Sequence, residues 1–118
     1  MLLAVGGHVL GELEPQSLRM ATGFGGGLGE TEQEMCGALS GGVMVIGGQF
    51  GRTHSGLDDG KVRTLARRYR ERFLTEFGHT QCAALRECVV LPHDGLGSCA
   101  VLVQRAAEVL LSVLEEDA

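Results

Sequence analysis

The chain has 118 residues, which is the size of one domain, so we expect a single domain spanning residues 1–118. Hydrophobic residues make up 44% of it, which is enough for a core and excludes a disordered chain. The formal net charge of -5 argues against a nucleic acid as partner. Because we find no apolar run of about 18 residues and no basic, cleavable leader, we expect no membrane association and a cytoplasmic location.

Glycine is unusually frequent, at 19 of the 118 residues, against a usual share of about 7%. Aromatic residues make up only 4%, and tryptophan is absent. We therefore expect a core built from leucine, valine, alanine and methionine, with backbone segments that approach one another closely.

The first half of the chain has the pattern of two short helices followed by a glycine-rich loop. The first is expected over residues 2–13, and the second runs from Pro15 to about residue 22, because proline suits the first position of a helix. Residues 23–29, with the sequence GFGGGLG, are expected to form a loop, since glycine disfavours helix.

A longer helix is predicted over residues 31–50. Thr31 followed by Glu34 has the spacing of a capping box, in which both side chains bond free backbone amides at the helix start. The glycines within this segment suggest that another helix or a cofactor lies against its backbone, although Gly47 and Gly48 could simply end the helix. Its apolar positions recur at helical spacing: Cys36, Leu39, Val43, Ile46 and Phe50.

The second half is expected to contain a loop over residues 51–60 and three further helices. The first is capped by Asp58 or Asp59 and ends before Gly78; the second, over residues 81–89, is capped by Thr80. Ser98 caps the last helix, which runs to about residue 116 and carries Cys99 on its inward face. The predicted fold is all-α: a small single-domain bundle of about five to six helices with a glycine-rich loop.

Four cysteines are the chemical candidates: Cys36, Cys82, Cys88 and Cys99. No two form a CxxC pair, which excludes the zinc-ribbon, thioredoxin-like and c-type haem signatures. Three of them fall near predicted helix starts, where the helix dipole favours the thiolate that binds metals and reacts. We therefore predict a redox or metal site assembled by the fold; the alternative is that the cysteines are small buried hydrophobic residues.

Two motifs carry a family resemblance. The stretch GFGGG at 23–27, followed by MCGALSG at 35–41, resembles the C_GCAxxG_C_C family, whose members are thought to be redox-active. Residues 73–85 resemble the family segment around its third cysteine, and Ser98 with Cys99 resembles the fourth, so the resemblance covers nearly the whole chain. A related domain forms part of split-Soret cytochrome c, which has been linked to an iron–sulfur cluster.

This resemblance implies a helical domain whose cysteines hold an iron–sulfur cluster or another metal, or cycle between thiol and disulfide, with a redox partner. Cys36, Cys82 and Cys99 are carried over as the redox and metal residues, and the surrounding glycines as cofactor-binding: Gly25, Gly26, Gly27, Gly37 and Gly41. The family also has a cysteine before the glycine loop. This chain has none there, so we expect either that Cys88, which is extra to the family pattern, replaces it as a metal ligand or that residues upstream of Met1 supply it.

Other interpretations remain open at this stage. The small-residue pattern from Gly37 to Gly42 could pack against a second copy in a homodimer, with the cysteines as core residues. A small-molecule pocket could also lie beneath the glycine loop with a thiolate beside it. A phosphate site is disfavoured because the loop lacks a P-loop lysine and carries Glu30, Glu32 and Glu34.

Isolated polar residues give weaker signals. His79 and His93 could be additional ligands, but we expect them to be solvated. A cluster of arginines is expected to form a solvated helix face: Arg67, Arg68, Arg70 and Arg72.

Overall fold

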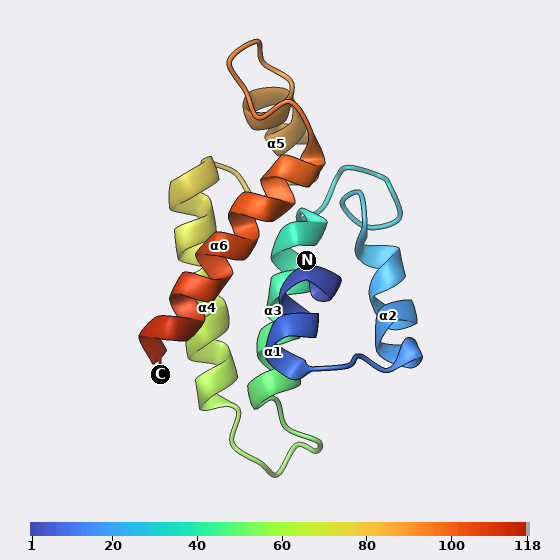
Figure 1. Ribbon diagram of the computed structural model, residues 1–118, viewed down its shortest axis with the longest axis vertical. Helices are drawn as coiled ribbons and strands as arrows, with labels where there is room; N and C mark the ends of the chain where they lie inside the picture. Colours follow the sequence, from blue (N-terminus) through green and yellow to red (C-terminus); the bar gives the residue numbers. More distant parts are fainter. Residues whose placement is uncertain (118) are drawn as a thin grey trace.

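The computed structural model describes residues 1–117 and confirms an all-α fold (Figure 1). Over these residues the only β-type pairing is a single antiparallel bridge between Met35 and Gln81. No helix in this range is both long and apolar enough to cross a membrane. The elements are η1 (Leu2–Gly6), α1 (Gly7–Leu10), α2 (Pro15–Ala21), η2 (Thr22–Phe24), α3 (Gly37–Phe50), α4 (Gly60–Phe77), α5 (Cys82–Leu85), η3 (Arg86–Val90) and α6 (Cys99–Asp117).

The two longest helices, α4 and α6, run antiparallel and pack against each other (Figure 1). Lys61 at the start of α4 pairs with Asp117 at the end of α6, at 2.9 Å. Phe73 lies between Tyr69 and Phe77, with ring centroids 6.1 and 4.7 Å away in edge-to-face arrangements. Helix α6 contributes buried residues at helical spacing: Leu102, Ala106, Leu110 and Val113.

Helix α3 packs through its glycines, as expected from their number. The Tyr69 ring lies directly over Gly42, and its hydroxyl donates a hydrogen bond of 2.9 Å to the carbonyl of Ala38. A Cβ atom added at Gly41 would lie 3.0 Å from the Met1 side chain. The close neighbours of this small-residue face are therefore other parts of the same chain.

The predicted start of α3 was wrong. The helix begins at Gly37, and its N-cap is Cys36, whose Sγ accepts a 3.4 Å hydrogen bond from the Ala38 amide. Thr31 instead donates to the carbonyls of Gly27 and Leu28, at 2.8 and 2.9 Å, and stabilises the preceding loop. The loop continues this far because Glu32 adopts a positive φ of 60°, which an α-helix cannot contain.

Two further helix boundaries differ from expectation. The first helical segment ends at Leu10 rather than residue 13, because Gly11 has a φ of 82° and leaves the helix. The N-cap before α5 is Gln81, not Thr80, and the helix widens into the π-helical turn η3 after Leu85.

Other predicted boundaries are confirmed. Helix α4 ends at Gly78 with a left-handed φ of 79°. The N-cap residue of α4 is Asp59, whose side chain makes no capping hydrogen bond, and the neighbouring Asp58 Oδ1 accepts from the amide of Gly60, at 2.9 Å. At the start of α6, Ser98 Oγ accepts from the amide of Val101, at 3.3 Å.

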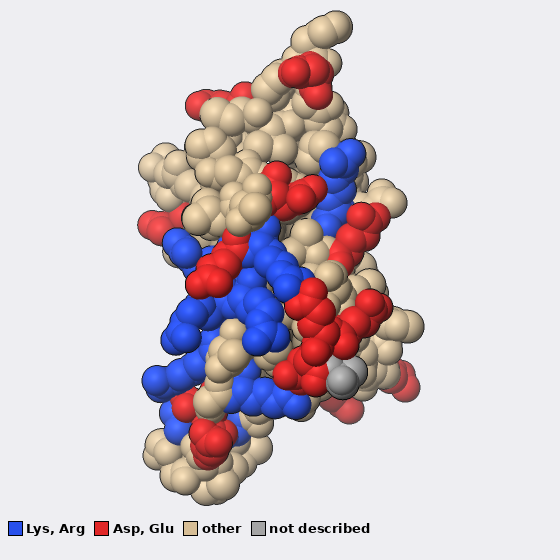
Figure 2. All heavy atoms as spheres, turned by 90° about the vertical axis from the view of Figure 1, so that its left-hand side faces the viewer, with Lys and Arg blue, Asp and Glu red and all other residues tan. Residues whose placement is uncertain are grey.

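Lysine and arginine side chains gather over α4, with acidic side chains beside them (Figure 2). Arg72 pairs with Glu116 of α6, and Arg63 pairs with Asp59, at 2.7 Å. Such exposed pairs contribute up to about 1 kcal/mol each, so this face is a solvated helix surface with partly neutralised charge.

Candidate thiol site

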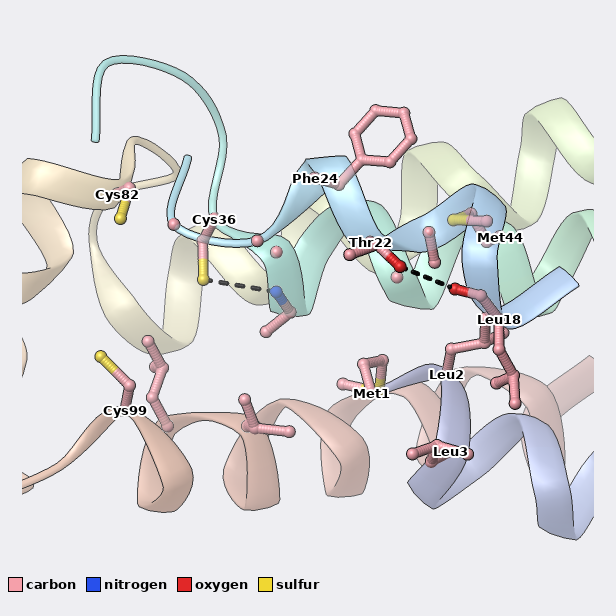
Figure 3. A pocket seen from close by; sticks show the side chains of 18 of the residues that line it. Met1, Leu2, Leu3, Leu18, Thr22, Phe24, Cys36, Met44, Cys82 and Cys99 are labelled. Carbon is pink, nitrogen blue, oxygen red and sulfur yellow. Dashed lines mark hydrogen bonds between the residues drawn. The ribbon is translucent and has the colours of Figure 1, made fainter. Parts of the chain in front are cut away.

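Three cysteines from separate helices line one pocket of about 510 Å³. Cys36 caps α3, Cys82 begins α5 and Cys99 begins α6. Figure 3 shows these three side chains at the same end of the pocket. Cys88 is exposed on η3 and does not line the pocket. All four cysteines are free thiols.

A short backbone pairing positions Cys36 and Cys82. The amide of Cys36 donates to the carbonyl of Thr80, at 2.8 Å, and the amide of Cys82 donates to that of Glu34, at 2.9 Å. Both cysteines directly follow the bridged pair, Met35 and Gln81, so their side chains leave the same side of the pairing. Diagonal residues in such a pairing have Cα atoms about 7–8 Å apart.

The glycine-rich loop packs closely against Cys82. Residues 26–30 all have φ between 60° and 71°, which coils the chain in the left-handed sense. A Cβ atom at Gly27 would lie 2.6 Å from the Cβ of Cys82 and 2.9 Å from the Cα of Glu32. Only glycine can occupy this position without displacing the cysteine.

The prediction that Cys99 points into the core was wrong. This residue is exposed, and the buried stripe of α6 begins one turn later, at Leu102. The side chain lies instead at the same end of the pocket as Cys36, across from it (Figure 3). The rest of the predicted stripe is confirmed, because Ala106, Leu110 and Val113 are buried, while Val103 lies between the core and the pocket.

Burial raises the pKa of both inner thiols, so the expected lowering of their pKa was wrong. Burial raises the pKa of Cys36, although the amides of Ala38 and Leu39 act to lower it. The pKa of Cys82 is also raised, first by burial and then by the carboxylate of Glu32. Both thiols are therefore protonated at neutral pH, and a metal would have to displace their protons.

The thiols also influence one another electrostatically. Negative charge on Cys82 or Cys99 raises the pKa of Cys36 further, and charge on Cys99 does the same to Cys82. Three thiolates at this end would therefore repel one another unless a cation lay among them. Arg86 provides one partial offset, because its guanidinium acts to lower the pKa of Cys82.

Of the other predicted site residues, the glycines lie at the pocket and the histidines do not. Four of the glycines line the pocket, namely Gly25, Gly26, Gly37 and Gly41, whereas Gly27 is in close contact with Cys82. Neither His79 nor His93 lines it. Across residues 1–117, no three histidine, cysteine, aspartate or glutamate side chains form a group that could hold a metal ion as they stand.

The sequence analysis allowed for a small-molecule pocket beside a thiolate, but it identified neither Arg86 nor the apolar residues of η1 and α2 among its lining. Arg86 Nη1 pairs with Glu32 Oε1 at 2.6 Å, beside the thiols. Its place four residues after Cys82, on the same helix face, was the available signal.

Comparison with known proteins identifies the family. The family described as "Putative redox-active protein (C_GCAxxG_C_C)" matches residues 1–113. No curated protein and no solved structure gives a significant match. Since the match spans nearly the whole chain and includes the three cysteines that line the pocket, this chain belongs to the C_GCAxxG_C_C family.

Proposed function

We propose that the chain is a redox protein in which Cys36, Cys82 and Cys99 together hold an iron–sulfur cluster or another thiolate-bound metal. The observation that carries this proposal is their position: three cysteines from three helices line the same end of one pocket. Cys88, which is exposed elsewhere, takes no part. A cytoplasmic redox partner is part of the same proposal.

The donor set suits such a group. Thiolates are the ligands of iron–sulfur clusters and of soft metals such as zinc and copper(I). A bound cluster would supply one-electron transfer at this end of the pocket. The chain's own contribution is to hold the sulfurs and to offset their charge, through the Ala38 amide at Cys36 and the Arg86 guanidinium near Cys82.

Thiol–disulfide cycling is the second form of this function, and protonation of the thiols disfavours it. The raised pKa values of Cys36 and Cys82 keep both in the less reactive protonated form.

An interaction module with the cysteines as core filler is the remaining alternative. It relied on a small-residue face of α3 that was free to meet a partner. Gly42 is covered by Tyr69 and Gly41 faces Met1, so that face is used within the chain. The thiols border a cavity instead of filling one, which supports a ligand-holding role.

Anaerobic purification tests the proposal. The protein is analysed for visible absorbance, iron, acid-labile sulfide and zinc, alongside the variants Cys36→Ser, Cys82→Ser and Cys99→Ser. We expect the bound group in the parent protein and its loss in each variant. Serine is an effective N-cap, so Cys36→Ser should preserve the start of α3.

Cys88→Ser is the matched control and should retain the group in full. A parent protein that is colourless and metal-free under these conditions, and remains so after reconstitution with iron and sulfide or with zinc, would refute the proposal. Equal loss in Cys88→Ser would show that the pocket is not where the group binds.

A further inference from the structure

The pocket extends well beyond the thiols into a region with apolar walls. Figure 3 shows Cys36, Cys82 and Cys99 at one end and Leu18, Leu2 and Met44 toward the other. Side chains or backbone atoms from η1, α2, η2 and α3 line this second part, which we call the apolar half: Leu2, Leu3, Leu18, Ala21, Thr22, Phe24 and Met44.

The inner side of helix α2 faces this cavity and does not pack into a core. None of its residues is fully buried, and its inward residues, Leu18 and Ala21, are half-buried where they line the pocket. Figure 1 shows α2 standing beside α3 at the edge of the bundle. Apolar helix faces normally gain stability by excluding water, so the apolar side of α2 is incomplete without an occupant.

The polar groups near the apolar half are already paired. The Thr22 hydroxyl donates to the carbonyl of Leu18, at 3.2 Å (Figure 3). Arg86 is the only lining residue with a charged side chain, and it pairs with Glu32. The α-amino group of Met1 also lies at the pocket, where burial lowers its pKa and so disfavours its charged form. The walls of the apolar half therefore offer an occupant mainly apolar contact.

We propose that the apolar half binds an uncharged, apolar small molecule whose inner end lies beside the three thiols. The whole pocket, including the thiol end, has a volume of about 510 Å³, which lies within the range of about 300–1,000 Å³ typical of small-molecule sites. The placement of this ligand next to a redox group rests on the proposed function, whereas binding itself requires none of the cysteines. A substrate of the redox group would thus be an apolar organic compound.

A second copy of the chain is the competing occupant, because Leu3 and Phe24 are 72% and 43% exposed along the pocket. We favour a small molecule because the side chains surround a hollow of ligand size instead of forming a flat face. The test includes self-association, which separates these two occupants.

The probe is N-phenyl-1-naphthylamine, an uncharged aromatic amine whose fluorescence rises in apolar surroundings. We expect saturable binding at one molecule per chain. Ala21→Phe should fill the apolar half and Leu18→Asp should place a charge in it, each weakening binding at least tenfold. Since α2 contributes no fully buried residue, both variants should fold, which circular dichroism verifies.

Gln16→Phe adds the same ring to an exposed position of α2 outside the pocket, and should bind the probe like the parent protein. The triple variant Cys36→Ser, Cys82→Ser, Cys99→Ser should also retain binding, so this inference can survive failure of the metal proposal. A bound cluster with no saturable probe binding would leave the metal proposal standing and overturn this one. Unchanged affinity in Ala21→Phe and Leu18→Asp, or a dimer by sedimentation whose formation excludes the probe, would also overturn it.

Discussion

The two sides of this molecule differ in how completely their apolar faces are covered. Where α4 packs against α3 and α6, the aromatic side chains of Tyr69, Phe73 and Phe77 are buried. On the side of η1 and α2, apolar side chains border a pocket of about 510 Å³ that three thiols also line. The difference indicates that the packing around α4 provides much of the stability, which allows the other side to keep a cavity for binding.

The largest effect should come from Phe73→Ala in the packed half. Phe73 is fully buried and contacts two other rings, and such a truncation costs about 3–5 kcal/mol of unfolding free energy. Phe24→Ala, on the pocket side, should cost less than about 1 kcal/mol because Phe24 is exposed. Urea unfolding measures both, and equal losses would contradict the division into two halves.

Gly27→Ala should have the next largest effect, and it acts on the thiol side. The positive φ of 69° costs about 1–2 kcal/mol for alanine, and the overlap with Cys82 and Glu32 adds about 1–3 kcal/mol. Gly29→Ala is the control, because Gly29 also has a positive φ but has open space around it. This variant should lose only the about 1–2 kcal/mol that the positive φ costs. Similar losses in the two variants would mean that Gly27 does not fix Cys82.

A smaller effect is expected for Gly42→Ala, which tests the contact between α3 and α4. The added methyl group would overlap the fully buried Tyr69 ring, at a cost of about 1–3 kcal/mol. Gly47→Ala lies in the same helix with nothing within 4 Å of its added Cβ, so it should stabilise the protein by up to about 1 kcal/mol. Thermal unfolding of both variants distinguishes close packing from helix propensity, because propensity alone would make both stabilising.

The sequence predicts the packed half well because its signals are local. Apolar residues of α4 repeat at helical spacing, and Gly78 ends the helix with a left-handed φ. The start of α3 was mispredicted because a long-range contact decides it. Pairing of residues 34–36 with 80–82 makes Cys36 the N-cap, whereas the local pattern of Thr31 and Glu34 suggested an earlier start.

The thiol site was only partly predictable. Family resemblance singled out Cys36, Cys82 and Cys99, and these three share the pocket. The pKa direction was missed because helix position is visible in a sequence, whereas burial depends on what covers the thiol. The apolar half was missed because α2 is short, and its few apolar residues line a cavity defined by other elements.

The smallest expected effect is a pH dependence of stability in the metal-free, reduced protein. Burial raises the folded-state pKa of Cys36 above the unfolded value of about 8.5. The folded state therefore holds this proton more tightly, so its contribution to stability is complete below the unfolded pKa and is lost as pH rises through the folded pKa. Cys82 acts in the same direction. We expect the free energy of unfolding to decline as the pH rises above the unfolded thiol pKa of about 8.5.

Cys36→Ser should flatten part of this decline, whereas Cys88→Ser, which alters an exposed thiol, should not. Tyr69, whose pKa is also raised by burial, contributes a similar loss, but only above about pH 10, where unfolded tyrosine ionises. Urea unfolding at intervals between pH 7 and pH 9.5, with chelator and reductant present, separates the thiols from the tyrosine. A stability that rises over this range would mean that the thiolate is favoured in the folded state, as expected if the helix dipole rather than burial controlled Cys36.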